Sequence, residues 1–117
     1  MITVYGLKNC DTCRKALGWL KAEGIAHRFH DVRADGITRA DIARFAEAAG
    51  WEKLLNKAST TWRELSDAEK DGLTGPRALA LMAAHPALIK RPVFEAVGKI
   101  VVGFREAEKA ALKAVSA

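Results

Sequence analysis

Little in this 117-residue sequence would export it, anchor it to a membrane or divide it into parts. The chain does not open with a charged segment followed by an apolar one, and no stretch approaches the roughly 18 consecutive apolar residues of a membrane-spanning helix. Repeats, low-complexity tracts and linkers are also missing. These absences predict one domain over residues 1–117, in a cytoplasmic protein without a membrane partner.

Cysteine is scarce, and its two copies, Cys10 and Cys13, stand three positions apart. In a reducing compartment this spacing indicates redox or metal chemistry rather than a structural bridge. With His27 and His30 the pair nearly matches a zinc-finger pattern, but the gap between the histidines is too short. An odd separation on a predicted strand would also turn the two rings to opposite faces. The sequence therefore predicts no bound metal.

Charge of one sign does not dominate any stretch, although the net charge is +5. Basic residues are mixed with acidic ones along the whole chain, which favours a solvated basic surface over a nucleic-acid interface. Hydrophobic residues make up 50% of the sequence and charged residues 28%, so a folded globular core is expected rather than disorder.

The two cysteines fall where a strand passes into a helix. Residues 2–5 are β-branched and aromatic, as in a buried strand, and Gly6 is expected to permit the turn that follows. The next segment has apolar residues at helical spacing and a glycine, Gly24, that suits the end of a helix. The apolar face of that predicted helix consists of Cys13, Ala16, Leu17 and Leu20.

This placement puts Cys10 at a helix N-terminus, where unpaired N–H groups and the helix dipole favour a thiolate. Lys8, Arg14 and Lys15 would add positive charge nearby, so Cys10 is predicted to be the attacking sulfur with a lowered pKa. Cys13 lies one turn further on, within the span of a disulfide. It is interpreted either as the thiol that resolves a mixed disulfide or as a buried core residue.

The rest of the chain predicts further strands and helices. Residues 26–32 form a second strand, with Asp31 accepting hydrogen bonds from the turn that follows. Thr38 and Asp41 have capping-box spacing and open a helix that ends at Gly50. The core face predicted for this helix consists of Ile42, Phe45, Ala46 and Ala49.

A small helical insert is expected over about residues 51–85. It contains a predicted loop at residues 59–61, a second capping box over residues 66–69 and a helix that starts at Pro76. Its tryptophans, Trp51 and Trp62, like Trp19 in the first helix, are interpreted as core or partly exposed aromatics.

The C-terminal part predicts a hairpin and a helix. Strands at residues 93–97 and 100–104 flank Gly98-Lys99, which suits a type II′ turn, and residues 106–115 form a helix. That helix is expected to pack through an alanine stripe, namely Ala107, Ala110, Ala111 and Ala114. The predicted fold is α/β and thioredoxin-like: a mixed four-stranded sheet flanked by helices, with the small helical insert.

Several motifs resemble those of one protein family. They are Tyr5-Gly6-x-Lys8-Asn9-Cys10-Asp11-Thr12, Phe29-His30-Asp31, Gly50-Trp51, Thr60-Thr61-Trp62-Arg63-x-Leu65 and Ile89-Lys90-Arg91-Pro92. On these residues the chain is similar to the arsenate-reductase-like (ArsC/Spx) family over nearly its whole length, most closely to the YffB branch. The resemblance implies a thioredoxin-like fold, a nucleophile at Cys10, and glutathione or a dithiol protein as electron source, with no bound cofactor.

The same resemblance implies where the substrate would bind. Lys8, Asn9, Arg91 and Pro92 occupy the matching positions, with a cis peptide bond before Pro92 that turns Arg91 toward the substrate. Arsenate reductases of this family hold the oxyanion with three arginines, and only Arg91 matches. Asn56 and Gly103 replace the other two, so arsenate is expected to be a poor substrate.

Two functions stay open on the sequence. The first is a thiol oxidoreductase in which Cys10 attacks an oxidised thiol substrate, by either a monothiol or a dithiol mechanism. The second is a regulator of the Spx type, which shares the Cys-x-x-Cys spacing and would bind RNA polymerase under redox control.

Overall fold

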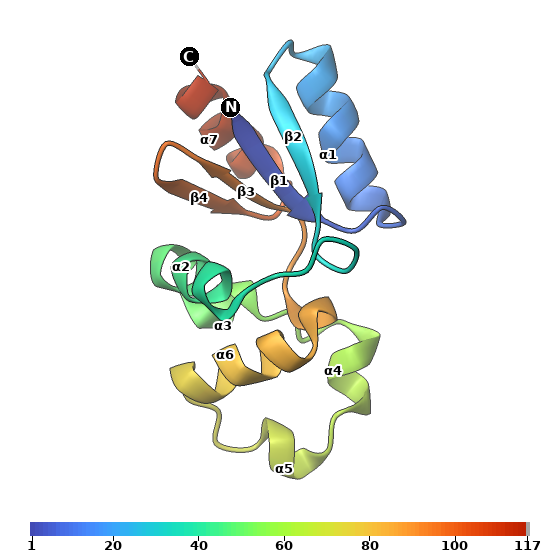
Figure 1. Cartoon of the computed structure of the whole chain (residues 1–117), viewed down its shortest axis with the longest axis vertical. Coiled ribbons are helices and arrows are strands. Elements are labelled where there is room, and N and C mark those ends of the chain that lie inside the picture. Colours follow the sequence, from blue (N-terminus) through green and yellow to red (C-terminus); the bar gives the residue numbers. More distant parts are fainter. Residues whose placement is uncertain (117) are drawn as a thin grey trace. The chain divides into compact units, whose positions relative to one another are not determined.

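The computed structural model describes residues 1–116 and divides the chain into two compact units (Figure 1). The sheet unit comprises Met1–Gly36 and the segment from Arg91 onward, and the helical unit comprises Ile37–Lys90. The helical unit therefore begins before residue 51, where the helical insert was expected to start. That the whole chain is a single domain stays a prediction.

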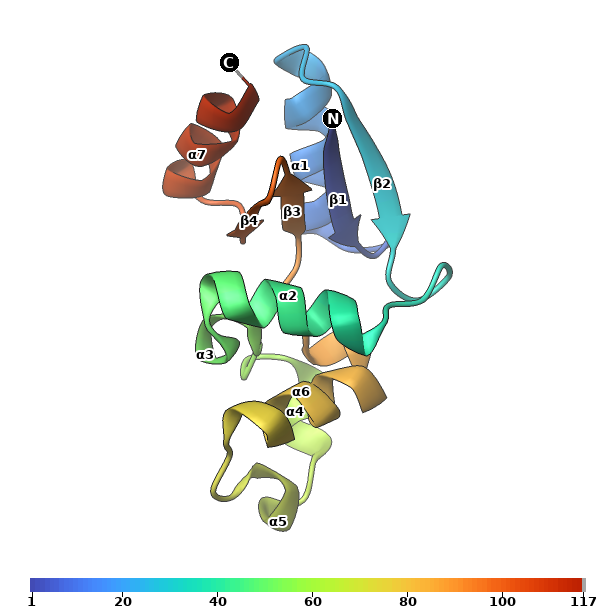
Figure 2. The same ribbon diagram turned by 60° about the vertical axis from the view of Figure 1, so that its left-hand side comes forward.

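The sheet unit contains a four-stranded mixed sheet (Figures 1 and 2). Its elements are β1 (Ile2–Gly6), α1 (Asp11–Ala22), β2 (His27–Asp31), β3 (Val93–Ala96), β4 (Lys99–Val102) and α7 (Glu106–Ser116). The strand order is β2-β1-β3-β4, with β1 and β2 parallel and the other pairs antiparallel. This is the predicted thioredoxin-like sheet.

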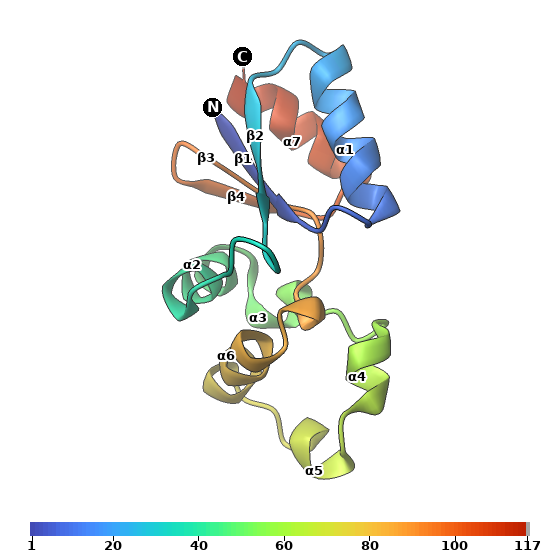
Figure 3. The same cartoon turned by 45° about the vertical axis from the view of Figure 1, so that its right-hand side comes forward.

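Helices α1 and α7 pack against one face of the sheet (Figure 3). Val4 in β1 is opposite Phe94 in β3, and both are buried with Leu20 of α1 and Leu112 of α7. Each buried side chain of this size stabilises the fold by about 1.5–3 kcal/mol. This packing fixes α1, and therefore its first residues, relative to the end of β1.

Helix α1 agrees with the sequence prediction. Cys13, Ala16 and Leu20 are buried, and Leu17 is half-buried against the same core. Gly24 follows the helix with a φ of +68°, the left-handed conformation expected after a helix C-terminus.

Helix α7 packs differently from the prediction. Ala107, Ala110 and Ala114 are exposed and Ala111 is half-buried, whereas Leu112 is buried and Val115 is half-buried against the core. The prediction that the alanines form the packing stripe was therefore wrong. A methyl group buries little area, so the larger side chains decide which face of the helix meets the sheet.

The hairpin turn also differs from the prediction. Ala96 pairs with Lys99, so the loop consists of Val97 and Gly98 rather than Gly98 and Lys99. Both loop residues have positive φ, +45° and +77°, as a type I′ turn requires and a type II′ turn does not. Val97 is β-branched and 85% exposed, so no packing around its side chain offsets the unfavourable backbone conformation.

The helical unit consists of short helices. They are α2 (Arg39–Ala49), α3 (Trp51–Leu54), α4 (Thr60–Glu64), α5 (Asp67–Lys70), α6 (Gly75–Ala84) and the 3₁₀ helix η1 (Pro86–Leu88). Ile42 and Phe45 of α2 and Ala78 and Met82 of α6 supply part of its core. Within residues 1–116, every helix is too short or too polar to cross a bilayer.

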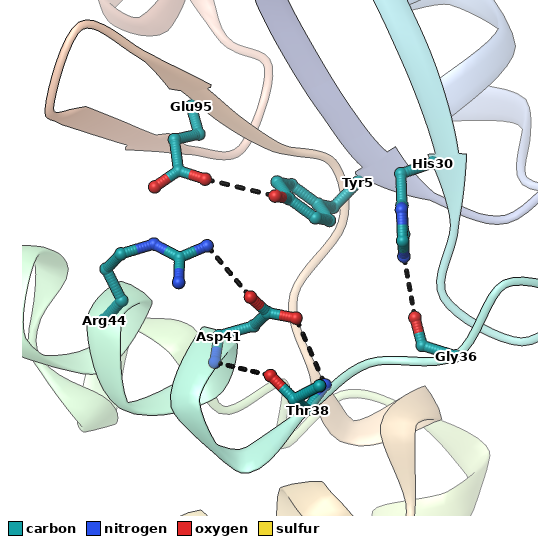
Figure 4. Close-up of polar contacts among 7 residues, drawn as sticks. All are labelled: Tyr5, His30, Gly36, Thr38, Asp41, Arg44 and Glu95. Carbon is teal, nitrogen blue, oxygen red and sulfur yellow. Dashed lines mark hydrogen bonds and ion pairs between the residues drawn. The ribbon is translucent and has the colours of Figure 1, made fainter.

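Both predicted capping boxes are present in this unit. The Thr38 hydroxyl accepts a hydrogen bond from the Asp41 N–H, and the Asp41 carboxylate accepts one from the Thr38 N–H (Figure 4). Ser66 and Glu69 repeat the arrangement at α5. Residues 59–61, in contrast, are not a loop, because Ser59 caps α4 by accepting from the Trp62 N–H.

Candidate active site

Cys10 is the N-cap residue of α1, as predicted. Its backbone is extended, with φ −97° and ψ 119°, and its carbonyl accepts the first helical hydrogen bond from the Arg14 N–H at 3.0 Å. The side chain makes no capping hydrogen bond as a neutral thiol. The Cys10 side chain is half-buried at the start of the helix. A charged sulfur at this position would meet the unpaired N–H groups of the first turn.

The surroundings of Cys10 lower its pKa. Burial is the largest single influence and opposes ionisation, but it is outweighed by hydrogen bonding from the Cys13 backbone and thiol, by hydrogen bonding from Arg91 and by the Arg91 charge. These groups favour the thiolate because each places a donor or a positive charge at the sulfur.

Arg91 is thus the cation that acts on Cys10, and the expectation for Arg14 was wrong. The Arg14 guanidinium pairs instead with the Asp11 carboxylate one turn along the helix, and both side chains are exposed. Lys8 and Lys15 are exposed as well. Asp11 lies three residues before Arg14, and oppositely charged side chains at this spacing pair along a helix.

Cys13 has the opposite environment. It is fully buried on the sheet side of α1, and burial is the main reason that its pKa is raised to about 11. Hydrogen bonding and charge from Cys10 raise the pKa further. No disulfide joins the two cysteines.

Gly6 makes room for Cys13. A Cβ atom placed on Gly6 would lie 2.5 Å from the Cys13 Sγ, far inside contact distance. The φ of Gly6 is not positive, so glycine is not required here for the sharp turn that was predicted. Glycine is required because the Cys13 side chain packs against this position.

The predicted substrate-binding residues frame the start of α1. Lys8 and Asn9 form an exposed turn that the Cys10 N–H closes by donating to the Leu7 carbonyl at 3.2 Å. The Arg91–Pro92 peptide bond is cis, as the family resemblance implied, and Pro92 is buried beside half-buried Arg91. All four residues belong to the sheet unit, as does Cys10.

Asp31 holds this turn in place, a contact that sequence reasoning missed. Its carboxylate accepts from the Arg33 and Ala34 N–H groups of the following turn, as predicted, but also from the Lys8 N–H at 3.2 Å. These hydrogen bonds lower the Asp31 pKa, and the one from the Ala34 N–H contributes most to this shift. The only sequence signal was an acidic residue at the end of a strand that runs parallel to β1.

Polar side chains line the sheet next to Asp31. The Tyr5 hydroxyl donates to Glu95 at 3.1 Å, and the His30 ring stacks at an angle on Tyr5 while its Nε2 contacts the Gly36 carbonyl at 2.7 Å (Figure 4). His27 contacts the Ile25 carbonyl instead. The two histidines that suggested zinc therefore bind different backbone groups.

The two positions that replace family arginines are occupied differently. Gly103 has a φ of +96°, a conformation that an arginine would adopt only under strain. Asn56 belongs to the helical unit, where its carboxamide accepts from the Ala58 N–H. Neither residue supplies a positive charge.

These features match one group of known proteins. A model of the ArsC family matches residues 5–112. The chain belongs to the ArsC family. An uncharacterised protein of Haemophilus influenzae is 47% identical over 108 residues, covering 92% of this chain and 95% of that protein. The global transcriptional regulator Spx of Streptococcus mutans is 24% identical over 110 residues, covering 92% and 80%.

Solved structures of ArsC-family proteins agree. A structure titled YffB protein is 42% identical, has a TM-score of 0.92 and covers 100% of both chains. An arsenate reductase (ArsC) related protein from Brucella melitensis is 43% identical, with a TM-score of 0.77 and coverage of 94% and 92%. The family predicted from the motifs is confirmed, including its likeness to YffB and Spx.

Proposed function

We propose that this ArsC-family chain is a thiol oxidoreductase with Cys10 as its nucleophile. The observation that supports this proposal is the contrast between two thiols three residues apart. The Cys10 pKa is lowered, whereas the Cys13 pKa is raised to about 11. Only a thiolate attacks a disulfide, and roughly one Cys13 in ten thousand is ionised at pH 7 with such a pKa.

The first step is an attack by the Cys10 thiolate on one sulfur of an oxidised substrate, R–S–S–R′. A Cys10–S–S–R bond forms while the substrate S–S bond breaks, and the electron pair leaves with R′S⁻, which takes a proton from water. Glutathione then attacks the R sulfur as a thiolate. The Cys10–S–S–R bond breaks, and Cys10 leaves again as a thiolate. The product is the mixed disulfide of glutathione and R, in which glutathione is the newly oxidised thiol.

Cys13 offers a second route, in which its own thiolate attacks Cys10 and releases RSH. Once Cys10 is in a disulfide, its charge no longer raises the Cys13 pKa, but burial, the larger influence, remains. A dithiol protein would then reduce the Cys10–Cys13 bond. Burial therefore favours the external thiol, with Cys13 acting mainly as a donor to the Cys10 thiolate.

The basic groups around Cys10 fit an anionic thiol such as glutathione. Lys8 is exposed in the turn that precedes Cys10, and the charge of half-buried Arg91 acts on the Cys10 sulfur. Asn9 adds an exposed amide in the same turn. We assign to these three residues the carboxylate and amide groups of the thiol substrate.

Mass spectrometry after treatment with oxidised glutathione tests the proposal. We expect one glutathione adduct on Cys10 in the wild type and in Cys13→Ser, and none in Cys10→Ser. Glutathione-dependent disulfide reduction should be lost in Cys10→Ser and retained in Cys13→Ser. An adduct on Cys13 alone, or full activity of Cys10→Ser, would contradict the assignment of the nucleophile.

Arsenate is not the proposed substrate. With Asn56 and Gly103 in place of two arginines, the site lacks two charge-assisted donors for an oxyanion. We expect arsenate reduction to be far slower than disulfide reduction by the same preparation. Equal rates would require a different oxyanion site.

An Spx-type regulator is the second candidate, supported by the Spx relative and by the Cys-x-x-Cys pair. In that case the chain would bind RNA polymerase, and oxidation of Cys10 and Cys13 would change the binding. A pull-down with purified RNA polymerase in reduced and oxidised buffer separates the candidates. Redox-dependent capture without glutathione-dependent activity would favour the regulator.

A further inference from the structure

Asp31 uses its two carboxylate oxygens for two separate tasks. The Oδ1 atom accepts from the Arg33 N–H at 2.8 Å and from the Ala34 N–H at 2.9 Å, which shapes the turn after β2. The Oδ2 atom accepts from the Lys8 N–H at 3.2 Å, which belongs to a segment 23 residues earlier. Asp31 is only 5% exposed and lies opposite Gly6 in the parallel ladder.

The hydrogen bond to Oδ2 comes from the turn that ends at Cys10. Lys8 is the second residue of the turn Leu7–Cys10, which is closed by the hydrogen bond from the Cys10 N–H to the Leu7 carbonyl. Fixing the Lys8 N–H ties this turn to the end of β2. The backbone of Cys10 is thereby held at the N-cap of α1, where Cys13 and Arg91 act on its sulfur.

We propose that Asp31 is a positioning residue for Cys10: Oδ2 anchors the turn Leu7–Cys10, while Oδ1 independently holds the turn after β2. The catalytic meaning of this role rests on the proposed function, but the anchoring itself does not.

Charge and position act on Cys10 in opposite directions. The negative charge of Asp31 disfavours a nearby thiolate, so removing the charge alone would lower the Cys10 pKa. Releasing the turn would move the sulfur away from its donors and raise the Cys10 pKa. The sign of the change therefore reports which influence dominates.

Asp31→Asn separates the two tasks. The amide oxygen of asparagine can replace Oδ1 and keep both hydrogen bonds of the following turn. Its NH₂ group would then face the Lys8 N–H, donor against donor. Asp35→Asn is the matched control, because Asp35 is exposed, carries the same charge, and uses Oδ2 to accept from the Asp31 N–H inside the same turn.

The experiment is the pH profile of iodoacetamide labelling at Cys10, followed by peptide mass spectrometry in the full chain. At pH 7 we expect Asp31→Asn to label about three- to fivefold more slowly than Asp35→Asn, the size of one lost hydrogen bond, with its profile displaced to higher pH. Identical profiles, or a displacement of Asp31→Asn to lower pH, would overturn the proposal.

A second pair of variants changes the donor of the same hydrogen bond, the Lys8 N–H. This pair tests the proposal if Asp31→Asn does not fold. Lys8→Pro removes the donor N–H. Proline is favoured at the second position of a turn, and the φ of Lys8 is not positive. Lys8→Ala removes only the side chain. Lys8→Pro should label Cys10 about three- to fivefold more slowly than Lys8→Ala, and equal rates would contradict the anchor.

The labelling profiles also separate this proposal from the proposed function. If the wild type shows no glutathione-dependent activity, the thiol oxidoreductase assignment fails. The difference between Asp31→Asn and Asp35→Asn would still support or overturn the anchor.

Discussion

Helices in the helical unit and helix α1 of the sheet unit begin in different ways. Helices α2, α4, α5 and α6 each begin after a Ser or Thr whose hydroxyl accepts a hydrogen bond from the first turn. Helix α1 begins after Cys10, whose thiol makes no such bond. The first group uses the N-cap position for stability. Helix α1 gives up this stabilisation and leaves its first N–H groups available to a charged sulfur.

The two units also differ in how closely side chains pack against their glycines. The sheet unit brings Cys13 so close to the β1 backbone that only glycine fits at position 6. Such tight packing belongs to the strand-to-helix junction that holds both thiols. In the described part of the helical unit, no Cβ added at a glycine would lie closer than 3.4 Å to a neighbour.

The largest effect is expected from Gly6→Ala. The added methyl group would overlap the Cys13 sulfur at 2.5 Å, so we expect a loss of about 1–3 kcal/mol in the free energy of unfolding. Gly18→Ala is the control in the same unit, because it is exposed in α1 with open space around it, and should gain roughly 0.5–1 kcal/mol. Urea unfolding measures both.

The cause can be isolated with Cys13→Ala. In that background Gly6→Ala should cost much less, because the overlapping sulfur is gone. An equal cost in both backgrounds would mean that Gly6 matters for another reason, such as its backbone conformation.

A smaller effect distinguishes the two kinds of helix start. Cys10→Ser introduces a good N-cap and should stabilise the protein by about 1 kcal/mol while it abolishes thiol chemistry. Ser66→Ala should destabilise the protein by about the same amount, because it removes the hydroxyl that accepts from Glu69. A loss of stability in Cys10→Ser at acid pH would contradict the comparison.

The pH of that measurement matters. A lowered folded-state pKa means that the Cys10 thiolate contributes stability above the unfolded pKa of about 8.5, and that this contribution is lost as the pH falls through the folded value. Below the folded value the Cys10 thiol is neutral in both states. The gain from Cys10→Ser should therefore be largest in acid and shrink as the pH rises.

The smallest effect is expected at the hairpin. Val97→Asn should gain about 0.5–1 kcal/mol, because asparagine tolerates a φ of +45° better than a β-branched residue. Gly98→Ala, with no steric obstacle but a φ of +77°, should lose about 1 kcal/mol. Thermal unfolding reports both, and a stabilised Gly98→Ala would show that the turn is not as described.

Much of the fold could be predicted because the signals were local. Residues 2–5, the helical spacing after Cys10 and the two capping boxes each specify their own element, and all appear in the structure. The alanine stripe of α7 failed because helical spacing shows several faces, and the sheet selects the one with the largest apolar side chains. The predicted hairpin loop was displaced by one residue, because the pairing of the strands and not the position of the glycine determines which residues form the loop.

The site was predicted less completely, for a physical reason. Cys10 at a helix start and Asp31 at a turn follow from neighbouring residues. The cation acting on Cys10 and the donor at Asp31 Oδ2 come from segments far apart in the sequence, Arg91 and Lys8. Arg14 is close to Cys10 in the sequence, but its guanidinium pairs with the Asp11 carboxylate.

The central claim is that two thiols three residues apart have been made chemically unequal. Its most direct test is the rate of iodoacetamide labelling of each cysteine in the reduced wild-type protein, measured by peptide mass spectrometry across the pH range. We expect Cys10 to react well before Cys13 at neutral pH, and Cys13 to follow only as the pH approaches its pKa of about 11. Equal rates at neutral pH, or faster labelling of Cys13, would contradict it.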